Sequence, residues 1–287
     1  MAVDSPWHRI SERTPAEIAE AALELHWAAQ VVAAAGQTFA EPADDDSHRA
    51  MTWHAGLRAF VGAPFAGAYP LRIALRPEDL ALLILDRTDE SIAVLPLAGQ
   101  TLDEAHEWLG LAVATYFGGA PPVLERPEYE MPSHPVENGA RFTDRRTAER
   151  SVLGALYAAA AEVLGEIAGA EAAASEVRCW PHHFDIATLI AERVNDRGDA
   201  EQTIGIGMAP SGGGCQFWYW YVSPWPYPER TELPALGRGA WHTEGWTGAV
   251  LTGEDTVAVP ADSRADEVRA FLNEAISASR EILAGSR

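Results

Sequence analysis

Apolar residues recur at intervals of three and four in four stretches of the chain, which is the spacing of one buried helix face. Thr14 with Glu17, and Thr101 with Glu104, have the spacing of a capping box at a helix start. Gly36 follows the first stretch, at a position where a left-handed cap is favoured. The pattern therefore predicts helices over residues 14–35, 101–117 and 144–168, and a last helix that begins after Ser263.

Short runs rich in β-branched and aromatic residues lie between these helices, separated by turn-forming residues. The runs cover residues 53–61, 71–75, 80–85 and 92–97 in the first half of the chain, and residues 176–191, 203–208, 216–223 and 241–251 in the second. Strands that cluster between helices, without alternating with them, are typical of the α+β class. We therefore expect antiparallel sheets flanked by helices, and the same order of elements in each half suggests two helix–sheet–helix repeats.

Residues 121–142 interrupt this pattern with five prolines and little periodicity. Such a composition is typical of a surface linker and not of a packed element. The sequence therefore predicts an N-terminal half over residues 1–120, a proline-rich linker over residues 121–142 and a C-terminal half over residues 143–287.

The charge balance narrows the choice of partners. The 287 residues include 42 acidic and 21 basic ones, which gives a formal net charge of -21. Phosphate backbones and anionic membrane surfaces repel such a chain, so we expect neither nucleic acid nor a membrane as a partner. Every basic residue is an arginine. Enzymes that form a Schiff base through lysine, and nucleotide-binding proteins that use a P-loop lysine, are therefore excluded.

Cysteine usage and the N-terminal residues bear on the cellular compartment. Cys179 and Cys215 form no C-x-x-C pair and are too few for a disulfide scaffold. The first residues lack the apolar core of a signal peptide, and no run approaches the ~18 apolar residues that span a bilayer. We therefore expect a cytoplasmic protein.

The residues from Arg178 to Ile190 hold the densest group of chemically active side chains. In an extended strand, His183 and Asp185 point to the same side, because side chains alternate along a strand. Asp185 is then placed to orient the imidazole of His183, as carboxylates do beside metal-bound and general-base histidines. A purely structural pair has the same spacing, and this alternative stays open.

His242 and Glu244 form a second pair with the same spacing. If the two segments are neighbouring strands, His183, Asp185, His242 and Glu244 meet. Imidazole and carboxylate groups bind zinc, manganese and iron, so we expect these four residues to be catalytic groups or ligands of a divalent metal. The glycines around His242 equally fit a loop whose polar side chains face water.

The residues from Gln216 to Pro228 are dominated by aromatic side chains. In a strand, Trp218 and Trp220 lie on one side, and Tyr219 and Tyr221 lie on the other. A central strand buried by helices on one side and loops on the other explains this pattern. In the alternative interpretation, tryptophans line an apolar pocket for a small neutral or cationic organic ligand. The residues expected to line it are Trp180, Trp218, Trp220, Trp241 and Trp246.

Other candidate motifs carry little chemistry. His26, Trp27 and Gln30 in the first helix could point into a cleft, although a histidine on a helix face is more often structural. Nucleophile-elbow, H-E-x-x-H, EF-hand and dinucleotide-binding motifs do not occur in a suitable context.

Several short segments together resemble a bacterial protein family of unknown function. They are Leu25-His26 with Gln30-Val31, Ser47-His48, Leu95-Pro-Leu97, His183-Phe-Asp-Ile-Ala187, Pro210-Ser-Gly-Gly213 and the aromatic run from Phe217 to Pro228. The family usually has His-Phe-Phe-Trp-Gly where this chain has Trp180-Pro-His-His183. It has no established activity, so the resemblance implies an architecture and no function.

Together these patterns predict a small-molecule pocket in the C-terminal half. With the four polar residues at its centre, the pocket would suit a metal-assisted hydrolase or lyase. The alternatives are a non-enzymatic protein that binds a small ligand, and a protein-interaction module that uses the aromatic strand. The sequence leaves the oligomeric state open.

Overall fold

The computed structural model describes residues 5–65, 69–229 and 233–285. The protein belongs to the α+β class, with helices packed on antiparallel strands, as the sequence predicts. It folds into two compact units that are interleaved along the chain. The N-terminal unit comprises Glu20–Gly154 and Arg178–Phe184, and the C-terminal unit comprises Met1–Ala19, Ala155–Val177 and Asp185–Arg287. Neither unit ends at the boundary expected at residues 121–142, because that whole segment belongs to the N-terminal unit.

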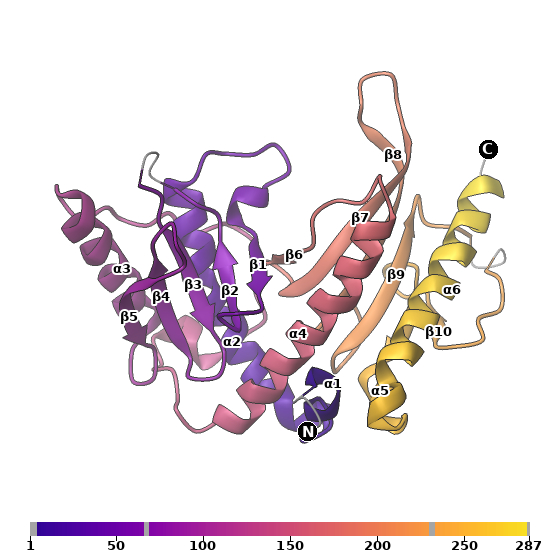
Figure 1. Ribbon diagram of the computed structural model, residues 1–287, viewed down its shortest axis with the longest axis horizontal. Helices are drawn as coiled ribbons and strands as arrows, with labels where there is room; N and C mark the ends of the chain where they lie inside the picture. Colours follow the sequence, from indigo (N-terminus) through magenta and orange to yellow (C-terminus); the bar gives the residue numbers. More distant parts are fainter. Residues whose placement is uncertain (1–4, 66–68, 230–232, 286–287) are drawn as a thin grey trace. The chain divides into compact units, whose positions relative to one another are not determined.

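The strands of the N-terminal unit run in the order β6-β1-β2-β3-β4-β5 (Figure 1). Their bounds are β1 Met51–His54, β2 Ala59–Gly62, β3 Arg72–Arg76, β4 Ala81–Leu85, β5 Ser91–Pro96 and β6 Arg178–Trp180. Each neighbouring pair is antiparallel. The run expected over residues 53–61 is therefore a hairpin, with β1 and β2 joined by the turn at residues 55–58.

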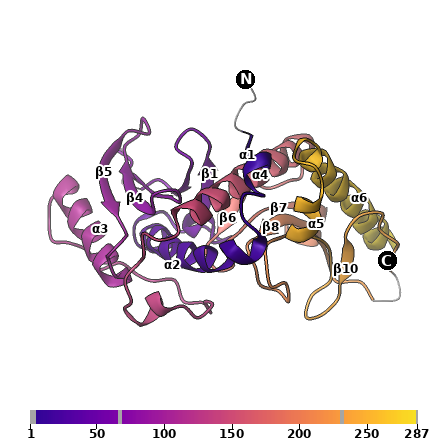
Figure 2. The same ribbon diagram turned by 90° about the horizontal axis from the view of Figure 1, so that it is seen from below.

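Two long helices lie on the same side of these strands, namely α2 (Pro15–Phe39) and α3 (Leu102–Phe117) (Figure 2). Both predicted capping boxes are confirmed. The Thr14 amide donates to Glu17 Oε2 over 2.7 Å, and the Thr101 amide donates to Glu104 Oε2 over 2.8 Å. The Gly36 cap is wrong, because α2 continues to Phe39. Gly36 serves close packing instead, since a Cβ atom there would lie 2.1 Å from the His48 carbonyl oxygen.

The helix α4 (Thr147–Ala170) corresponds to the helix expected over residues 144–168. In the part of the chain that the structure describes, it is the one helix long and apolar enough to cross a membrane by length and composition. Within its most apolar window, 56% of the residues are buried inside the protein, as in the core helix of a globular fold.

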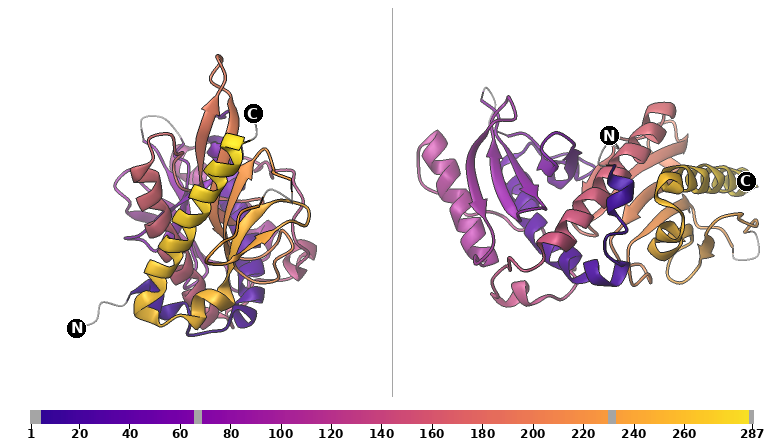
Figure 3. Two further views of the ribbon diagram at one scale, coloured as in Figure 1. Left: turned by 90° about the vertical axis from the view of Figure 1, so that its right-hand side faces the viewer. Right: turned by 60° about the horizontal axis from the view of Figure 1, so that its bottom comes forward.

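The strands of the C-terminal unit run in the order β10-β11-β9-β8-β7. Their bounds are β7 Asp185–Val194, β8 Ala200–Ala209, β9 Tyr219–Trp225, β10 Ala240–His242 and β11 Gly248–Thr252. The last helix, α6 (Arg264–Gly285), packs on β9 and β8 and is seen lengthwise in Figure 3. The short helices α1 (Pro6–Arg9) and α5 (Gly253–Ala258) complete the unit, and Arg264 of α6 donates to the Trp7 carbonyl oxygen over 2.8 Å.

Candidate functional site

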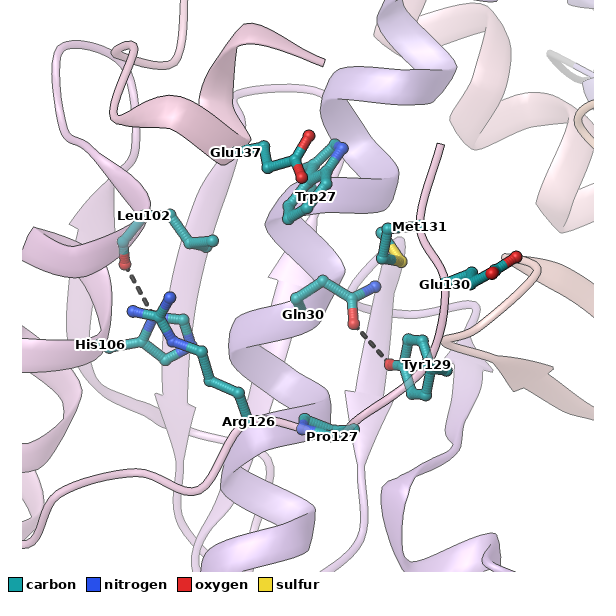
Figure 4. A pocket seen from close by; sticks show the side chains of 10 residues that line it. All are labelled: Trp27, Gln30, Leu102, His106, Arg126, Pro127, Tyr129, Glu130, Met131 and Glu137. Atoms are coloured by element: carbon teal, nitrogen blue, oxygen red, sulfur yellow. Dashed lines mark hydrogen bonds between the residues drawn. The ribbon is translucent and has the colours of Figure 1, made fainter. Parts of the chain in front are cut away.

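A cavity of about 460 Å³ lies in the N-terminal unit between α2, α3 and the proline-rich segment, residues 121–142 (Figure 4). Trp27 and Gln30 of α2 line it, together with Leu102 and His106 of α3. The members of each pair are three or four residues apart and therefore share a helix face. The remaining lining residues come from the proline-rich segment, namely Arg126, Pro127, Tyr129, Glu130, Met131 and Glu137.

Residues 121–142, expected to be a surface linker, are largely exposed and have little regular structure, but hydrogen bonds tie them to α2 and to the residues just before α3. The Glu125 amide donates to Thr38 Oγ1 of α2 over 2.8 Å. Trp27 Nε1 donates to the Pro132 carbonyl oxygen over 3.0 Å. Near its end, Phe142 exchanges two backbone hydrogen bonds of 2.9 Å with Gly99 and Gln100, just before α3. The segment is therefore a fixed wall of the cavity.

Gly110 lets the segment approach α3 closely. A Cβ atom at Gly110 would lie 2.7 Å from the Pro122 carbonyl oxygen and 3.6 Å from Leu124 Cδ1. The first distance is too short for any residue other than glycine, so the missing side chain fixes where the segment crosses the helix.

His106 is the most distinctive polar residue of the cavity. Its Nδ1 lies 2.8 Å from the Leu102 carbonyl oxygen, and a carbonyl only accepts, so Nδ1 carries the proton. The pKa of His106 is lowered from 6.5 to about 4, first by burial and second by the positive charge of Arg126. The ring is therefore neutral at pH 7, and Nε2 presents a lone pair. Nε2 is buried and has no hydrogen-bond partner among the described residues.

Gln30 connects the cavity to the turn between β6 and β7. Its Oε1 accepts a hydrogen bond of 2.5 Å from the Tyr129 hydroxyl. Its Nε2 donates to the Pro181 carbonyl oxygen over 2.9 Å, and His26 Nε2 donates to the same oxygen over 2.8 Å. The ring of Tyr129 also lies beside His182, with ring centroids 5.9 Å apart. The turn that contains His182 and His183 is thus held next to the cavity.

The predicted strand pair of His183 and Asp185 does not form. His183 lies in a turn over residues 181–184, closed by a hydrogen bond of 2.7 Å from the Phe184 amide to the Trp180 carbonyl oxygen. Phe184 has a φ angle of 56°, so the alternation of a strand is broken before Asp185. His183 is exposed, whereas Asp185 is buried and accepts a hydrogen bond of 2.5 Å from the Tyr221 hydroxyl.

The predicted adjacency of the two His–carboxylate segments is also wrong. Asp185 is the first residue of β7, and His242 is the last residue of β10. The strands β8, β9 and β11 lie between β7 and β10 in the sheet. His242 contacts the backbone carbonyl oxygen of Glu244 at 2.8 Å, and the Glu244 side chain is exposed. Among the described residues, no group of three or more His, Cys, Asp or Glu side chains is placed to hold a metal ion. The four-ligand set of His183, Asp185, His242 and Glu244 is therefore not assembled.

The five tryptophans expected to line one pocket have separate environments. Trp218 and Trp220 lie in the core, and Trp220 stacks on Trp7 with ring centroids 6.0 Å apart. Trp241 donates to the Pro234 carbonyl oxygen over 2.7 Å, and Trp246 donates to that of Gly213 over 2.6 Å. Trp180 lies in β6, with its ring 6.3 Å from that of His182. The interpretation of residues 216–223 as a central strand fits better, because β9 lies in the middle of its sheet.

Most of the cavity residues were not predicted from the sequence. Trp27 and Gln30 were candidates, but His106, Arg126 and Tyr129 were not. The usable signals were Gly110 inside a predicted helix and the aromatic Tyr129 within the proline-rich segment. Comparison with protein-family models, with curated proteins and with solved structures gives no match for the chain. The resemblance to a bacterial family of unknown function therefore stays a prediction.

Proposed function

We propose that the protein binds a small organic molecule in the cavity between α2, α3 and the proline-rich segment. The observation that carries this proposal is a cavity of about 460 Å³ whose wall includes His106, a histidine with a buried Nε2 acceptor that has no partner among the described residues. Ligand sites have volumes of ~300–1,000 Å³. A buried acceptor without a hydrogen bond costs ~1–3 kcal/mol, which a ligand that donates to it recovers.

Binding fits this site better than general acid–base catalysis does. A general base works best when its pKa is near the working pH, and the pKa of His106 is about 4. Trp27 and Leu102 offer buried apolar surface, and Tyr129 and Gln30 are already bonded to each other. The site therefore supports the non-enzymatic alternative of the sequence analysis, a protein that binds a small ligand, with the pocket in the N-terminal unit.

A fragment screen by saturation-transfer NMR tests the proposal. The probes are small aromatic amines, acids and amino acids, applied to the wild-type protein and to Trp27→Leu and His106→Phe. Trp225→Leu is the matched control, because Trp225 is 52% exposed and lies outside the cavity. We expect fragments that bind the wild type and the control and lose binding in both cavity variants. The absence of binders, or equal binding by all four folded proteins, would overturn the proposal.

A further inference from the structure

The cavity carries a cation next to the His106 acceptor. Arg126 and His106 both lie on the α3 side of the cavity (Figure 4). The charge of Arg126 is felt at the imidazole, where it is the second cause of the lowered pKa. A ligand at this end of the cavity therefore lies next to the neutral imidazole of His106 and the positive charge of Arg126.

The guanidinium of Arg126 is able to take a further anionic partner. It forms an ion pair with Asp103 of α3, and the two side chains are 54% and 80% exposed. The ion pair uses the Nη2 atom of Arg126. A guanidinium has five N–H donors in one plane, so a bond through Nη2 does not use all of them. An exposed ion pair contributes little stability, so a ligand carboxylate can share or replace Asp103 at low cost.

Neither a simple acid nor a simple amine satisfies both groups. In a ligand with only a carboxylate, the carboxylate lone pairs repel the lone pair of His106 Nε2. In a ligand with only an ammonium group, that group is repelled by the positive charge of Arg126. We propose that the cavity binds a free α-amino acid with an apolar side chain, its ammonium group donating to His106 Nε2 and its carboxylate pairing with Arg126. This assignment rests on the proposed binding function of the cavity and names the ligand class.

The rest of the cavity wall suits the apolar side chain of such a ligand. Trp27 and Leu102 are buried, and Met131 is half-buried, so the wall between the helices offers contact surface for an apolar side chain.

Isothermal titration calorimetry on the full chain tests the assignment. The probes are the apolar α-amino acids and, for phenylalanine, the decarboxylated analogue phenethylamine and the deaminated analogue 3-phenylpropionate. We expect at least one apolar amino acid to bind, and to bind about tenfold or more tighter than its two analogues. Arg126→Gln and His106→Phe should each weaken that binding by about tenfold or more. The control Arg145→Gln, at an exposed arginine that does not line the cavity, should leave it unchanged.

The outcomes separate this assignment from the proposed function. If no apolar amino acid binds, or if phenethylamine or 3-phenylpropionate binds as tightly as the amino acid, the zwitterion assignment is overturned. Fragments that still bind in a manner dependent on Trp27 and His106 would then leave the proposed binding function standing. If Arg126→Gln and Arg145→Gln behave alike, Arg126 is not the carboxylate partner and the assignment fails.

Discussion

The hydroxyl of Tyr129 donates a hydrogen bond of 2.5 Å to Oε1 of Gln30, which joins the proline-rich segment to the middle of α2. Gln30 is buried, and its other polar atom is already bonded to the Pro181 carbonyl oxygen. One buried amide therefore fixes two chain segments that lie far from it in the sequence. The shape of the cavity depends on this contact.

Tyr129→Phe should lower the free energy of unfolding by about 1–2 kcal/mol, because it leaves Gln30 Oε1 buried without its donor. Urea denaturation measures the change. Tyr227→Phe is the control, since Tyr227 is 46% exposed. Equal losses in the two variants would show that the Tyr129 contact contributes nothing specific.

Gly110→Ala should lower stability by about 1–3 kcal/mol, because the new methyl group would lie 2.7 Å from the Pro122 carbonyl oxygen. The displaced segment should also become more sensitive to limited proteolysis within residues 121–142. Gly165→Ala in α4 is the control, since a Cβ atom there meets nothing within 4 Å. That change should raise stability by up to about 1 kcal/mol. A stabilising Gly110→Ala would contradict the close approach.

Gly207→Ala should be strongly destabilising, because Tyr221 of β9 crosses Gly207 of β8 to reach Asp185 of β7. A Cβ atom at Gly207 would lie 2.6 Å from the Tyr221 hydroxyl oxygen and 2.7 Å from the Ile186 carbonyl oxygen. We expect a loss of about 2 kcal/mol or more in thermal or urea unfolding. Gly205→Ala in the same strand should be tolerated, because its nearest atoms would lie 3.8 Å and 3.9 Å away. Similar effects at both glycines would refute the crossing.

His106 should make the protein less stable in mild acid. Its pKa is lowered from 6.5 to about 4 in the folded protein, so the unfolded chain binds the proton more readily. Stability is then retained above pH 6.5 and is lost as the pH falls from 6.5 towards 4. The wild type should lose about 2 kcal/mol more than His106→Phe between pH 7 and pH 5.

Urea denaturation of both proteins at pH 7 and pH 5 measures this difference. The pKa of His26 is also lowered to about 4 by burial, but His26 is present in both proteins and its effect cancels. Identical pH dependence of the two proteins would show that His106 is not held neutral by the fold.

The sequence predicts the helices and most strands because these depend on local patterns. The capping boxes at Thr14 and Thr101 form as expected, and the alternation around Trp220 matches a strand with one helix-covered face. Local patterns do not reveal that Phe184 adopts a left-handed conformation, which ends the run through His183. They also do not reveal the order in which strands pair, which separates β7 from β10.

The cavity was harder to predict because its residues come from three segments distant in the sequence. Trp27, His106 and Tyr129 meet only through the packing of α2, α3 and the proline-rich segment. The composition of residues 121–142 is typical of a linker. Composition does not reveal the hydrogen bonds that backbone amides of this segment donate to Thr38 and Gln100. Gly110 inside a helix is a local sign that another chain segment approaches there.

Fluorine NMR on protein labelled with 5-fluorotryptophan tests the central claim most directly, because it compares the cavity with the site expected from the sequence. Each of the 10 tryptophan signals is assigned by substituting that residue with phenylalanine. A binding fragment or amino acid is then titrated into the wild-type protein. Binding in the cavity predicts a large shift of the Trp27 signal, with those of Trp218, Trp220 and Trp246 unchanged. Shifts confined to Trp241 and Trp246, or a Trp27 signal that stays in place at saturation, would contradict it.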